Sequence, residues 1–340
     1  MHLRLLALAG FSAAAICLVA QSADGPINQT DAQGRKQGTW VRKWAESDQV
    51  RYTGQFKDDK PVGSFVYYST KGKVESRVDH YPDGKAAHGI HFHPNGKVMA
   101  EGRYVGQQKD STWNYYGEDG ILRSSELWKA GKLNGAVTTF FKDGAVAERK
   151  TYRNGVLEGL SEQFFPGGKI RYRAQFAGGE PEGRETFFFP NGNKEIEGGY
   201  VNGSRDGVWR YYNEDGSVQL QALYAQGRLV KKKYENGTFT EYWDDGQPKS
   251  EVTYKNGKRE GPFTEWYDNG KWVNVPVKVG PQGAEKPDME RKLTGQGKKR
   301  EGTYRNDLLN GPVKEYDEKG RLTSNLTFLN GEPAKDGSRP

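Results

Sequence analysis

The sequence predicts an all-β protein: an elongated array of about ten to eleven stacked antiparallel 24-residue β-hairpin repeats, arranged as a single-sheet ribbon. Three observations support this fold class. Glycine accounts for 45 of 340 residues and aromatic residues for 12%, although only 34% of the chain is apolar. The glycines and aromatics recur at a fixed spacing, and the segments between them alternate in polarity. Multi-span membrane proteins need longer apolar runs, and disordered chains have fewer aromatics.

A 24-residue period runs through the chain. Seven positions, used here as the anchors of the repeats, follow one another at this spacing: Gly63, Ala87, Ser111, Gly135, Gly159, Gly183 and Gly207. Gly38 lies 25 residues before Gly63, one residue more than the period. Gly237, Gly261 and Gly311 continue the series, with insertions before Gly237 and before Gly311. Self-similarity at a fixed period indicates a repeat architecture, in which neighbouring units bury one another.

Three further sets of equivalent positions, called columns here, lie at constant distances from the anchors. Five residues after each anchor from Gly63 onward, the residue is aromatic: Tyr68, Phe92, Tyr116, Phe140, Phe164, Phe188, Tyr212, Tyr242, Trp266 and Tyr316. Nine residues after each of these anchors the residue is glycine, from Gly72 to Gly320. A second aromatic column, seventeen residues after the anchor, includes Tyr104, Trp128, Tyr152, Phe176, Tyr200, Tyr224, Tyr254 and Phe328, with His80 in that place in one repeat.

Each repeat is predicted to contain two strands and two tight turns. Residues 170–176 and 209–211 alternate between packed and polar side chains, which is the pattern of a strand with one covered face. Asn-Gly and Asp-Gly pairs such as Asn95-Gly96 and Asp143-Gly144 stand between the strands. These pairs are typical of primed hairpin turns, because both central residues of such turns need a positive φ. The same chemistry is expected at the second turn, as in Asn154-Gly155.

We expect contacts between rings to hold the array together. An isolated hairpin is marginal in water, but stacked hairpins bring rings of neighbouring repeats close to one another. Aromatic pairs contribute about 0.5–1.5 kcal/mol each beyond the burial of area. Ring contacts between copies should therefore replace a conventional core. The first repeat differs, with Lys43 in the place of a ring, as expected where an edge must be protected.

Residues 1–23 are predicted to be a signal peptide. Arg4 supplies a short positive region, and residues 5–20 form an uncharged run rich in alanine and leucine. A membrane-spanning helix needs ~20 residues, which is longer than this run, so a secretion signal is favoured over an anchor. The one cysteine, Cys17, lies in this segment, and a mature chain would carry neither a disulfide nor a reactive thiol. We expect a periplasmic or extracellular protein.

The remaining chain is predicted to divide into four segments. Residues 24–270 hold the main hairpin array and residues 301–332 the final repeat. Between them, residues 271–300 form a basic insert with three prolines and four glycines, which is expected to be a loop. Residues 333–340 form a polar tail. A second, six-residue insertion between Gly227 and Gly237 includes a run of three lysines.

Two units show the repeat most clearly. One runs from Asn202-Gly203 through Asp206-Gly207-Val208-Trp209-Arg210-Tyr211-Tyr212 to Asp215-Gly216, and the other runs from Asn256 to Gly270. In these units the chain resembles the MORN-repeat variant family, in particular the YwqK-type antitoxin-like proteins, over about residues 29–331. The resemblance implies stacked hairpins in one elongated sheet and roles in scaffolding, membrane association or toxin neutralisation, without catalytic residues. The predicted leader would restrict toxin neutralisation to a toxin met in the envelope.

Three histidines are candidates for a metal site. His88, His91 and His93 form a His-x-x-His-x-His pattern, and His91 and His93 would share one strand face, which is suitable geometry for zinc. Packing is the favoured interpretation, because His91 occupies the place of Tyr67 and Tyr115 in other repeats. We predict no resident metal or cofactor.

Two sets of residues are candidates for a binding surface. Trp40, Trp113 and Trp209 each lie two residues after an anchor; exposed, they would stack on sugars, but the sequence favours packing. Basic residues of the two insertions could meet anionic lipid or an acidic partner, or belong to solvated loops. They are Lys231, Lys232, Lys233, Lys286, Arg291, Lys292, Lys298, Lys299 and Arg300.

The favoured function is a non-enzymatic protein-binding module or envelope scaffold, with toxin neutralisation as one form of it. The chain has neither a Gly-x-Ser-x-Gly elbow nor a phosphate-binding loop, and a ribbon offers grooves rather than the cleft that paired catalytic carboxylates need. A protein partner is expected. A cell-wall carbohydrate-binding protein and an anionic membrane-surface binder are the alternatives. Nucleic acid is disfavoured, because export and buried rings do not suit base stacking.

Overall fold

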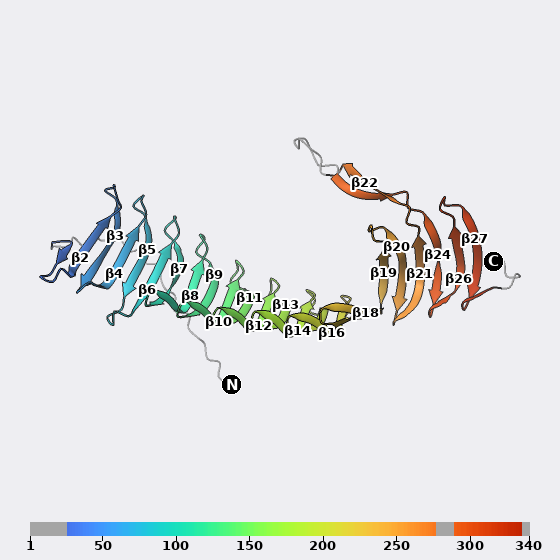
Figure 1. The fold of residues 1–340 in the computed structure, drawn as a ribbon, viewed down its shortest axis with the longest axis horizontal. Helices are drawn as coiled ribbons and strands as arrows, with labels where there is room; N and C mark the ends of the chain where they lie inside the picture. Colours follow the sequence, from blue (N-terminus) through green and yellow to red (C-terminus); the bar gives the residue numbers. More distant parts are fainter. Residues whose placement is uncertain (1–25, 277–288, 335–340) are drawn as a thin grey trace, which may run out of the picture. The chain divides into compact units, whose positions relative to one another are not determined.

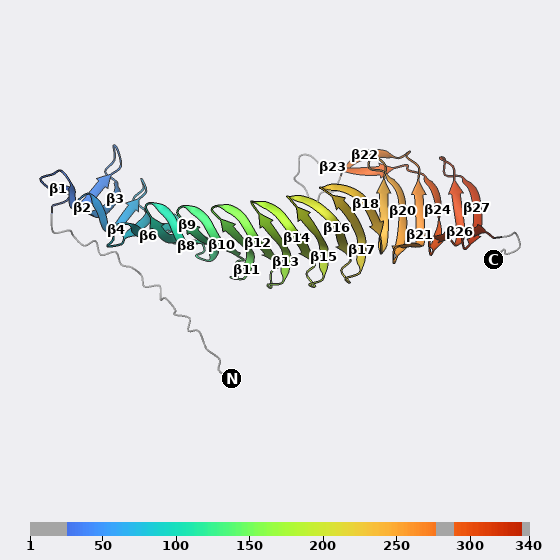
Figure 2. The same cartoon turned by 60° about the horizontal axis from the view of Figure 1, so that its bottom comes forward.

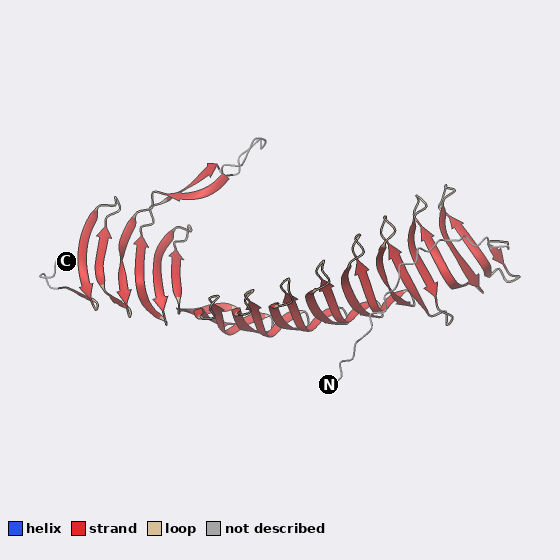
Figure 3. Ribbon diagram, turned by 180° about the vertical axis from the view of Figure 1, so that it is seen from behind, coloured by secondary structure: helices blue, strands red, loops and turns tan. Residues whose placement is uncertain are grey.

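The computed structural model describes residues 26–276 and 289–334. The predicted signal peptide, the middle of the insert with Lys286, and the end of the polar tail lie outside the described residues. The chain divides into two compact units, Met1–Lys132 and Leu133–Pro340. The described part of each unit consists of strands and turns (Figures 1 and 3). Within the two described ranges, no helix has the length and apolarity to cross a membrane.

The first unit is a ladder of antiparallel strands, in which each strand pairs with the next along the chain. The strands are β1 (Gln29–Thr30), β2 (Lys36–Lys43), β3 (Val50–Lys57), β4 (Lys60–Tyr68), β5 (Val74–His80), β6 (Ala86–Phe92), β7 (Val98–Val105), β8 (Gln108–Tyr116) and β9 (Leu122–Lys129). The predicted stacking of hairpins is confirmed in this unit.

The second unit begins with nine strands that also pair in sequence order and lie side by side in Figure 2. They are β10 (Lys132–Phe140), β11 (Val146–Arg153), β12 (Val156–Phe164), β13 (Ile170–Ala177), β14 (Glu180–Phe188), β15 (Lys194–Val201), β16 (Ser204–Tyr212), β17 (Val218–Ala225) and β18 (Arg228–Tyr234). The all-β hairpin prediction is confirmed here as well.

The remaining strands of the second unit form a further antiparallel sheet and a two-stranded ribbon. The sheet contains β19 (Gly237–Tyr242), β20 (Pro248–Lys255), β21 (Lys258–Trp266), β24 (Lys298–Arg305), β25 (Leu308–Leu309), β26 (Gly311–Tyr316), β27 (Leu322–Leu329) and β28 (Glu332–Pro333). The ribbon contains β22 (Lys271–Pro276) and β23 (Met289–Thr294).

The loop predicted for residues 271–300 is wrong at both ends of the segment. Its first residues form β22, whose partner is β23, and Lys298–Arg300 begin β24. The apolar and β-branched residues Trp272, Val273 and Val275 favour a strand here despite the nearby prolines. The repeat array resumes across the insert, since β24 pairs with β21.

The six-residue insertion splits one strand of the array into two. In an ordinary repeat a single strand such as β16 pairs on both of its edges, with β15 and with β17. At the insertion, β18 pairs with β17 and β19 pairs with β20, and the described residues contain no ladder between β18 and β19. The rings of Tyr234 and Phe239 stack across the split, with centroids 4.2 Å apart.

The two kinds of turn differ, which corrects the prediction that both are primed. In the second turn of the repeat both central residues have positive φ, as in Asn154 (52°) and Gly155 (87°). In the first turn only the glycine does, for example Gly96 at 84°. There the Gly96 N–H donates to the His93 carbonyl, and the Asn95 side chain accepts from the Lys97 N–H at 3.0 Å. Asn and Asp favour this turn because their side chains can bond the backbone two residues on.

The anchors mark irregularities within the first strand of most repeats. Gly63, Ser111, Gly183 and Gly207 have φ between 60° and 74°, and the pairing register shifts next to each of them. An extra residue at positive φ is characteristic of a β-bulge, which explains the preference for glycine. Ala87 is the exception, because its strand β6 pairs with β5 without a shift.

Candidate interaction surfaces

One face of each sheet carries the large rings, and their packing supplies the core. A ring two residues after an anchor lies over a glycine of the preceding strand, as Phe65 does over Gly54 and Trp113 over Gly102. The indole N–H of Trp113 donates to the Arg103 carbonyl at 2.9 Å. Trp113 is 1% exposed and Phe65 is 3% exposed, although the sheet has one layer. The glycine lets the ring lie flat against the backbone.

Rings of consecutive repeats alternate along this face. Tyr104 contacts Trp113 with ring centroids 4.8 Å apart, and Tyr200 contacts Trp209 at 5.3 Å. Each pair joins one repeat to the next, as the sequence predicted for ring contacts between copies. The rings involved are those two and seventeen residues after the anchor.

Two of the three candidate tryptophans are buried and are therefore not exposed binding residues. Trp209 is 0% exposed and Trp113 is 1% exposed, so neither indole offers a face to a sugar. Trp40 is half-buried and packs edge-to-face on Phe56, with centroids 5.8 Å apart. The packing interpretation therefore describes Trp113 and Trp209, and the three residues do not form an open stripe.

A cation covers several of these rings from a position two residues before the anchor. Lys36 lies 5.0 Å from the ring centroid of Trp40, Lys109 4.8 Å from that of Trp113, and Arg205 4.1 Å from that of Trp209. Cation–π contacts of this kind contribute about 0.5–1 kcal/mol at exposed sites and more when desolvated. This column was not predicted from the sequence, although its residues lie at a constant distance from the anchors.

The three candidate histidines have separate partners. The His91 ring stacks on Trp113 with centroids 6.0 Å apart, and its Nε2 lies 3.1 Å from the Tyr104 hydroxyl. His93 bonds the Tyr116 carbonyl at 2.9 Å, beyond the end of β6, and His88 lies 3.9 Å from Glu101. The described residues contain no group of three His, Cys, Asp or Glu side chains arranged for a metal. His91 thus occupies a ring position.

The opposite face of the sheet is polar and its charges are held in place by neighbours. Glu162 on β12 accepts from Arg173 on β13 at 2.8 Å and lies 3.6 Å from Arg149 on β11. The Glu162 side chain is 8% exposed, whereas those of the two arginines are about half exposed. A buried carboxylate therefore orients two guanidinium groups toward solvent across three strands.

The aromatic column five residues after the anchor belongs to this polar face. The hydroxyls of Tyr116 and Tyr212 donate to the carboxylates of Glu101 and Glu197, at 2.7 and 2.5 Å. Burial raises the pKa of Tyr116 and of Tyr212 to about 12, and the adjacent carboxylate adds to the shift. These rings act as hydrogen-bond donors between neighbouring repeats, a role that the expectation of ring stacking did not include.

Side chains just before the anchors link neighbouring repeats, and these links were not predicted from the sequence. Glu182 accepts a hydrogen bond from the backbone N–H of Asn202 at 2.8 Å, and Glu158 accepts from that of Gly178 at 2.9 Å. The donors lie 20 residues further along the chain. The signal is an acid or amide one residue before the anchor.

The predicted basic residues occupy different strands and environments. Lys231 and Lys232 on β18 are exposed, as are Lys292 on β23 and Lys299 on β24. The others have partners among the described residues: Lys233 with Glu235, Lys298 with Glu301, Arg300 with Glu315, and Arg291 over the ring of Trp272. Lys286 lies outside the described residues.

Several solved structures are distantly similar to the chain, and no curated protein matches it. A TcdB2-TccC3-Cdc42 structure is 13% identical over 87% of this chain and 16% of that chain, with a TM-score of 0.18. The Photorhabdus luminescens Tc holotoxin pore is 13% identical over 89% of this chain and 17% of that chain (TM-score 0.16). A porin-like protein from Bacteroides uniformis is 8% identical over 74% and 92% (TM-score 0.13). The chain spans about a sixth of the length of the toxin chains.

A family match covers part of the second unit. The MORN repeat variant matches four times, at residues 157–177, 181–202, 205–226 and 231–256. The first three matches each cover one hairpin, from β12–β13 to β16–β17, and the fourth spans the split strand and β20. Repeats of this family are generally interaction modules rather than enzymes. These four stretches of the second unit are therefore repeats of the MORN repeat variant family.

Proposed function

We propose that this chain is a non-enzymatic protein-binding module or envelope scaffold. The observation that carries the proposal is the polar face, where buried carboxylates such as Glu162 hold half-exposed arginines in a fixed register. Charged groups that are already oriented lose less conformational freedom on binding, so they favour recognition of a partner. The repeat would multiply weak contacts of this kind along one face.

A charged contact to an acidic partner is the specific form of the proposal. Lys231 and Lys232 on β18 are exposed, and the described residues show no acid paired with either. The test captures partners from envelope extract on the immobilised full chain and on the variant Lys231→Glu/Lys232→Glu. The matched control is Lys57→Glu/Lys60→Glu, which reverses two exposed lysines at the β3–β4 turn.

We expect the β18 reversal, but not the control reversal, to reduce recovery of the partner. A folded, soluble wild-type chain that recovers no partner would count against the module. Equal recovery by all three proteins would remove the charged contact while leaving a protein-binding role.

The proposal also includes export of the chain to the cell envelope and neutralisation of a toxin there. Export rests on the sequence of residues 1–23, and N-terminal sequencing of the protein recovered from the cell envelope tests it. A mature terminus near residue 23 or 24 supports export, and an intact Met1 in the cytoplasm contradicts it. Neutralisation would require that co-expression of the chain rescues cells from a toxin that acts in the envelope.

An anionic membrane surface is the second candidate partner. Leu229 and Val230, which are 41% and 52% exposed, adjoin the lysines of β18, and exposed apolar residues next to lysines suit an anionic lipid surface. Flotation with vesicles of anionic and of neutral lipid separates the two candidates. Binding to anionic vesicles that the β18 reversal abolishes would favour the membrane, and no flotation would exclude it.

A further inference from the structure

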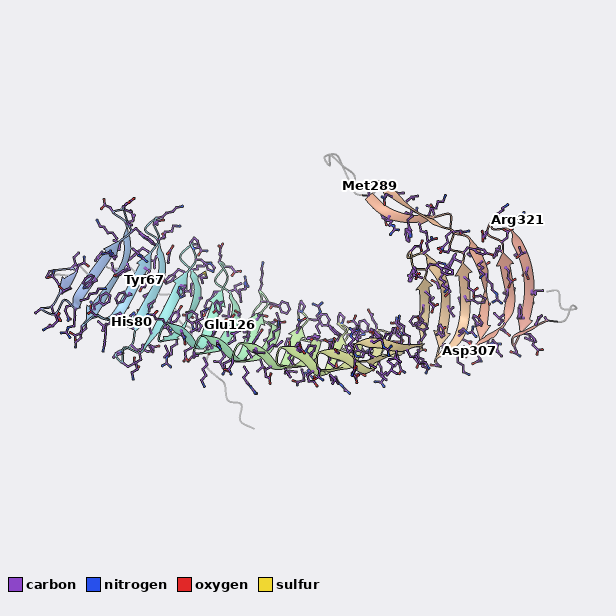
Figure 4. The ribbon with its side chains drawn as sticks, viewed as in Figure 1. Tyr67, His80, Glu126, Met289, Asp307 and Arg321 are labelled. Atoms are coloured by element: carbon purple, nitrogen blue, oxygen red, sulfur yellow. The ribbon has the colours of Figure 1, made fainter. Side chains whose placement is uncertain are left out.

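The first unit contains an aromatic hollow of 810 Å³ on the ring face of β3 to β7. One side is lined by Tyr52, Phe65, Tyr67 and His80, and the other by His91 and Tyr104. Figure 4 labels Tyr67 and His80 on the paired strands β4 and β5. Binding pockets for small groups have this size and combine aromatic walls with a few polar atoms.

The hollow exists because one repeat lacks its ring. Two residues after the anchor, neighbouring repeats carry Phe65 and Trp113, but the repeat of Ala87 carries Gly89. Its anchor also lacks the bulge found in the neighbouring repeats. Tyr104 leans over Gly89 but leaves the space between Tyr67 and His91 open.

The cation that would cover this missing ring is nevertheless present. Lys85 stands two residues before Ala87 and lines the hollow. Its backbone is equivalent to those of Lys109 and Arg205: the three carbonyls accept from glycine N–H groups at 3.1, 2.9 and 2.8 Å. Lys109 and Arg205 cover Trp113 and Trp209. Lys85 has no such ring, because its own repeat provides none.

We propose that this hollow receives an aromatic side chain of a protein partner, with Lys85 covering the incoming ring. The inference rests on the proposed protein-binding function and names the group that would be recognised. The walls are rings, which favour edge-to-face or offset contacts with another ring. Aromatic side chains that fill a concave site commonly dominate the affinity of a protein interface.

The charge of the lining also suits a neutral ring. Lys85 is the charged residue in the lining, and burial lowers the pKa of His80 and of His91, which keeps both imidazoles neutral at pH 7. No acid lines the hollow among the described residues, so a cationic side chain would find no countercharge there. The Ser76 side chain lies on the floor, opposite both Tyr67 and His91 in the strand register.

The test titrates the full chain with N-acetyl-tryptophanamide and observes saturation transfer and the imidazole resonances of His80 and His91. We expect saturable binding with a dissociation constant of about a millimolar and shifts of both imidazoles. Lys85→Ala should weaken binding about two- to fivefold, the effect of one exposed cation–π contact. Ser76→Trp should abolish it by filling the hollow from within.

Lys71→Ala is the matched control, since it removes an exposed charge of the same unit away from the lining. Unchanged binding by Lys85→Ala would overturn the proposal. So would the absence of binding by the wild-type chain at amide concentrations up to about 20 times the expected dissociation constant. Binding of N-acetyl-leucinamide equal to that of the tryptophan amide would also overturn it, because no ring is then required. So would binding of N-acetylglucosamine in place of the aromatic amide, which would assign the hollow to a sugar.

Two outcomes distinguish a failure of the aromatic-binding hollow from a failure of the proposed protein-binding function. If Ser76→Trp still captures the partner of the wild-type chain, the partner does not use the hollow and the inference fails alone. If the hollow binds the aromatic amide but the chain captures no protein, the proposed function fails instead.

Discussion

Replacing Gly198 by alanine should destabilise the chain, because a ring already occupies the space of the new methyl group. A Cβ on Gly198 would lie 2.5 Å from Cγ of Trp209 and nearer still to two other ring atoms. Real Cβ atoms essentially never approach within 3.0 Å of a neighbour. Trp209 is 0% exposed, so its ring cannot withdraw without disturbing its other contacts.

The neighbouring glycine provides a matched control. A Cβ on Gly199 would be 3.5 Å from the Asp206 carbonyl oxygen, which is an ordinary contact, and neither glycine has a positive φ. Both substitutions restrict the unfolded chain equally, a gain of about 0.4–1 kcal/mol. The difference between them therefore isolates the clash, for which overpacking predicts about 1–3 kcal/mol.

Urea unfolding followed by circular dichroism measures the difference. We expect Gly198→Ala to unfold at lower urea than the wild type and Gly199→Ala at equal or higher urea. Long repeat arrays need not unfold in one step, so the two midpoints are compared within the same transition. Equal midpoints for the two variants would refute the ring-on-glycine packing.

Three further outcomes follow from other contacts. Ser111 has a φ of 60°, so Ser111→Gly should raise the free energy of unfolding by up to about 1 kcal/mol; an unchanged or lower thermal midpoint would contradict this. Glu162→Ala should cost about 1–3 kcal/mol in urea unfolding, because it removes a buried acceptor of Arg173, and a cost near zero would mean that the pair does not stabilise the fold. Backbone N–H donors hold the pKa of Asp119 and of Asp317 below the ordinary 3.8. Their stabilisation is fully present above about pH 5 and is lost as the pH falls through the unfolded and then the lowered folded pKa, so Asp119→Asn should flatten the acid limb of the stability curve measured from about pH 6 to 2.

The hairpins could be predicted from the sequence because their signals are local. The alternation of polarity and the Asn-Gly and Asp-Gly pairs fix strands and turns within a few residues of each other. The type of the first turn could not be predicted in the same way. Asn95 and Gly96 suit a primed turn by composition, but the side-chain bond from Asn95 to the Lys97 N–H favours the other geometry.

The ring-on-glycine contact involves different strands, so residue type alone did not reveal it. Gly54, Gly102 and Gly198 each lie nine residues before an anchor whose repeat carries a ring. Where the ring is absent, as at Gly89, the nine-before position is Val78. A glycine at the nine-before position thus accompanies a large ring two residues after the anchor, and a larger residue accompanies its absence. This paired change could have indicated the contact from the sequence. The hollow and its uncovered Lys85 depend on the same change, and become apparent once the columns are compared across strands.

The amino-acid composition of residues 271–300 led to the prediction of a loop where the structure has strands. Prolines and glycines dominate the middle of residues 271–300, and they outweighed the β-branched residues at its start. The position of β24 beside β21 depends on pairing between segments on opposite sides of the insert, which the local pattern does not specify.

The α-proton chemical shifts of the glycines beneath the tryptophans report directly on whether each indole packs on the preceding repeat. A proton held against the face of an indole is shifted upfield by the ring current, so we expect strongly upfield α-protons for Gly102 and Gly198 and ordinary shifts for Gly199. Ordinary shifts at Gly102 and Gly198 would contradict the packing of each ring on the preceding repeat.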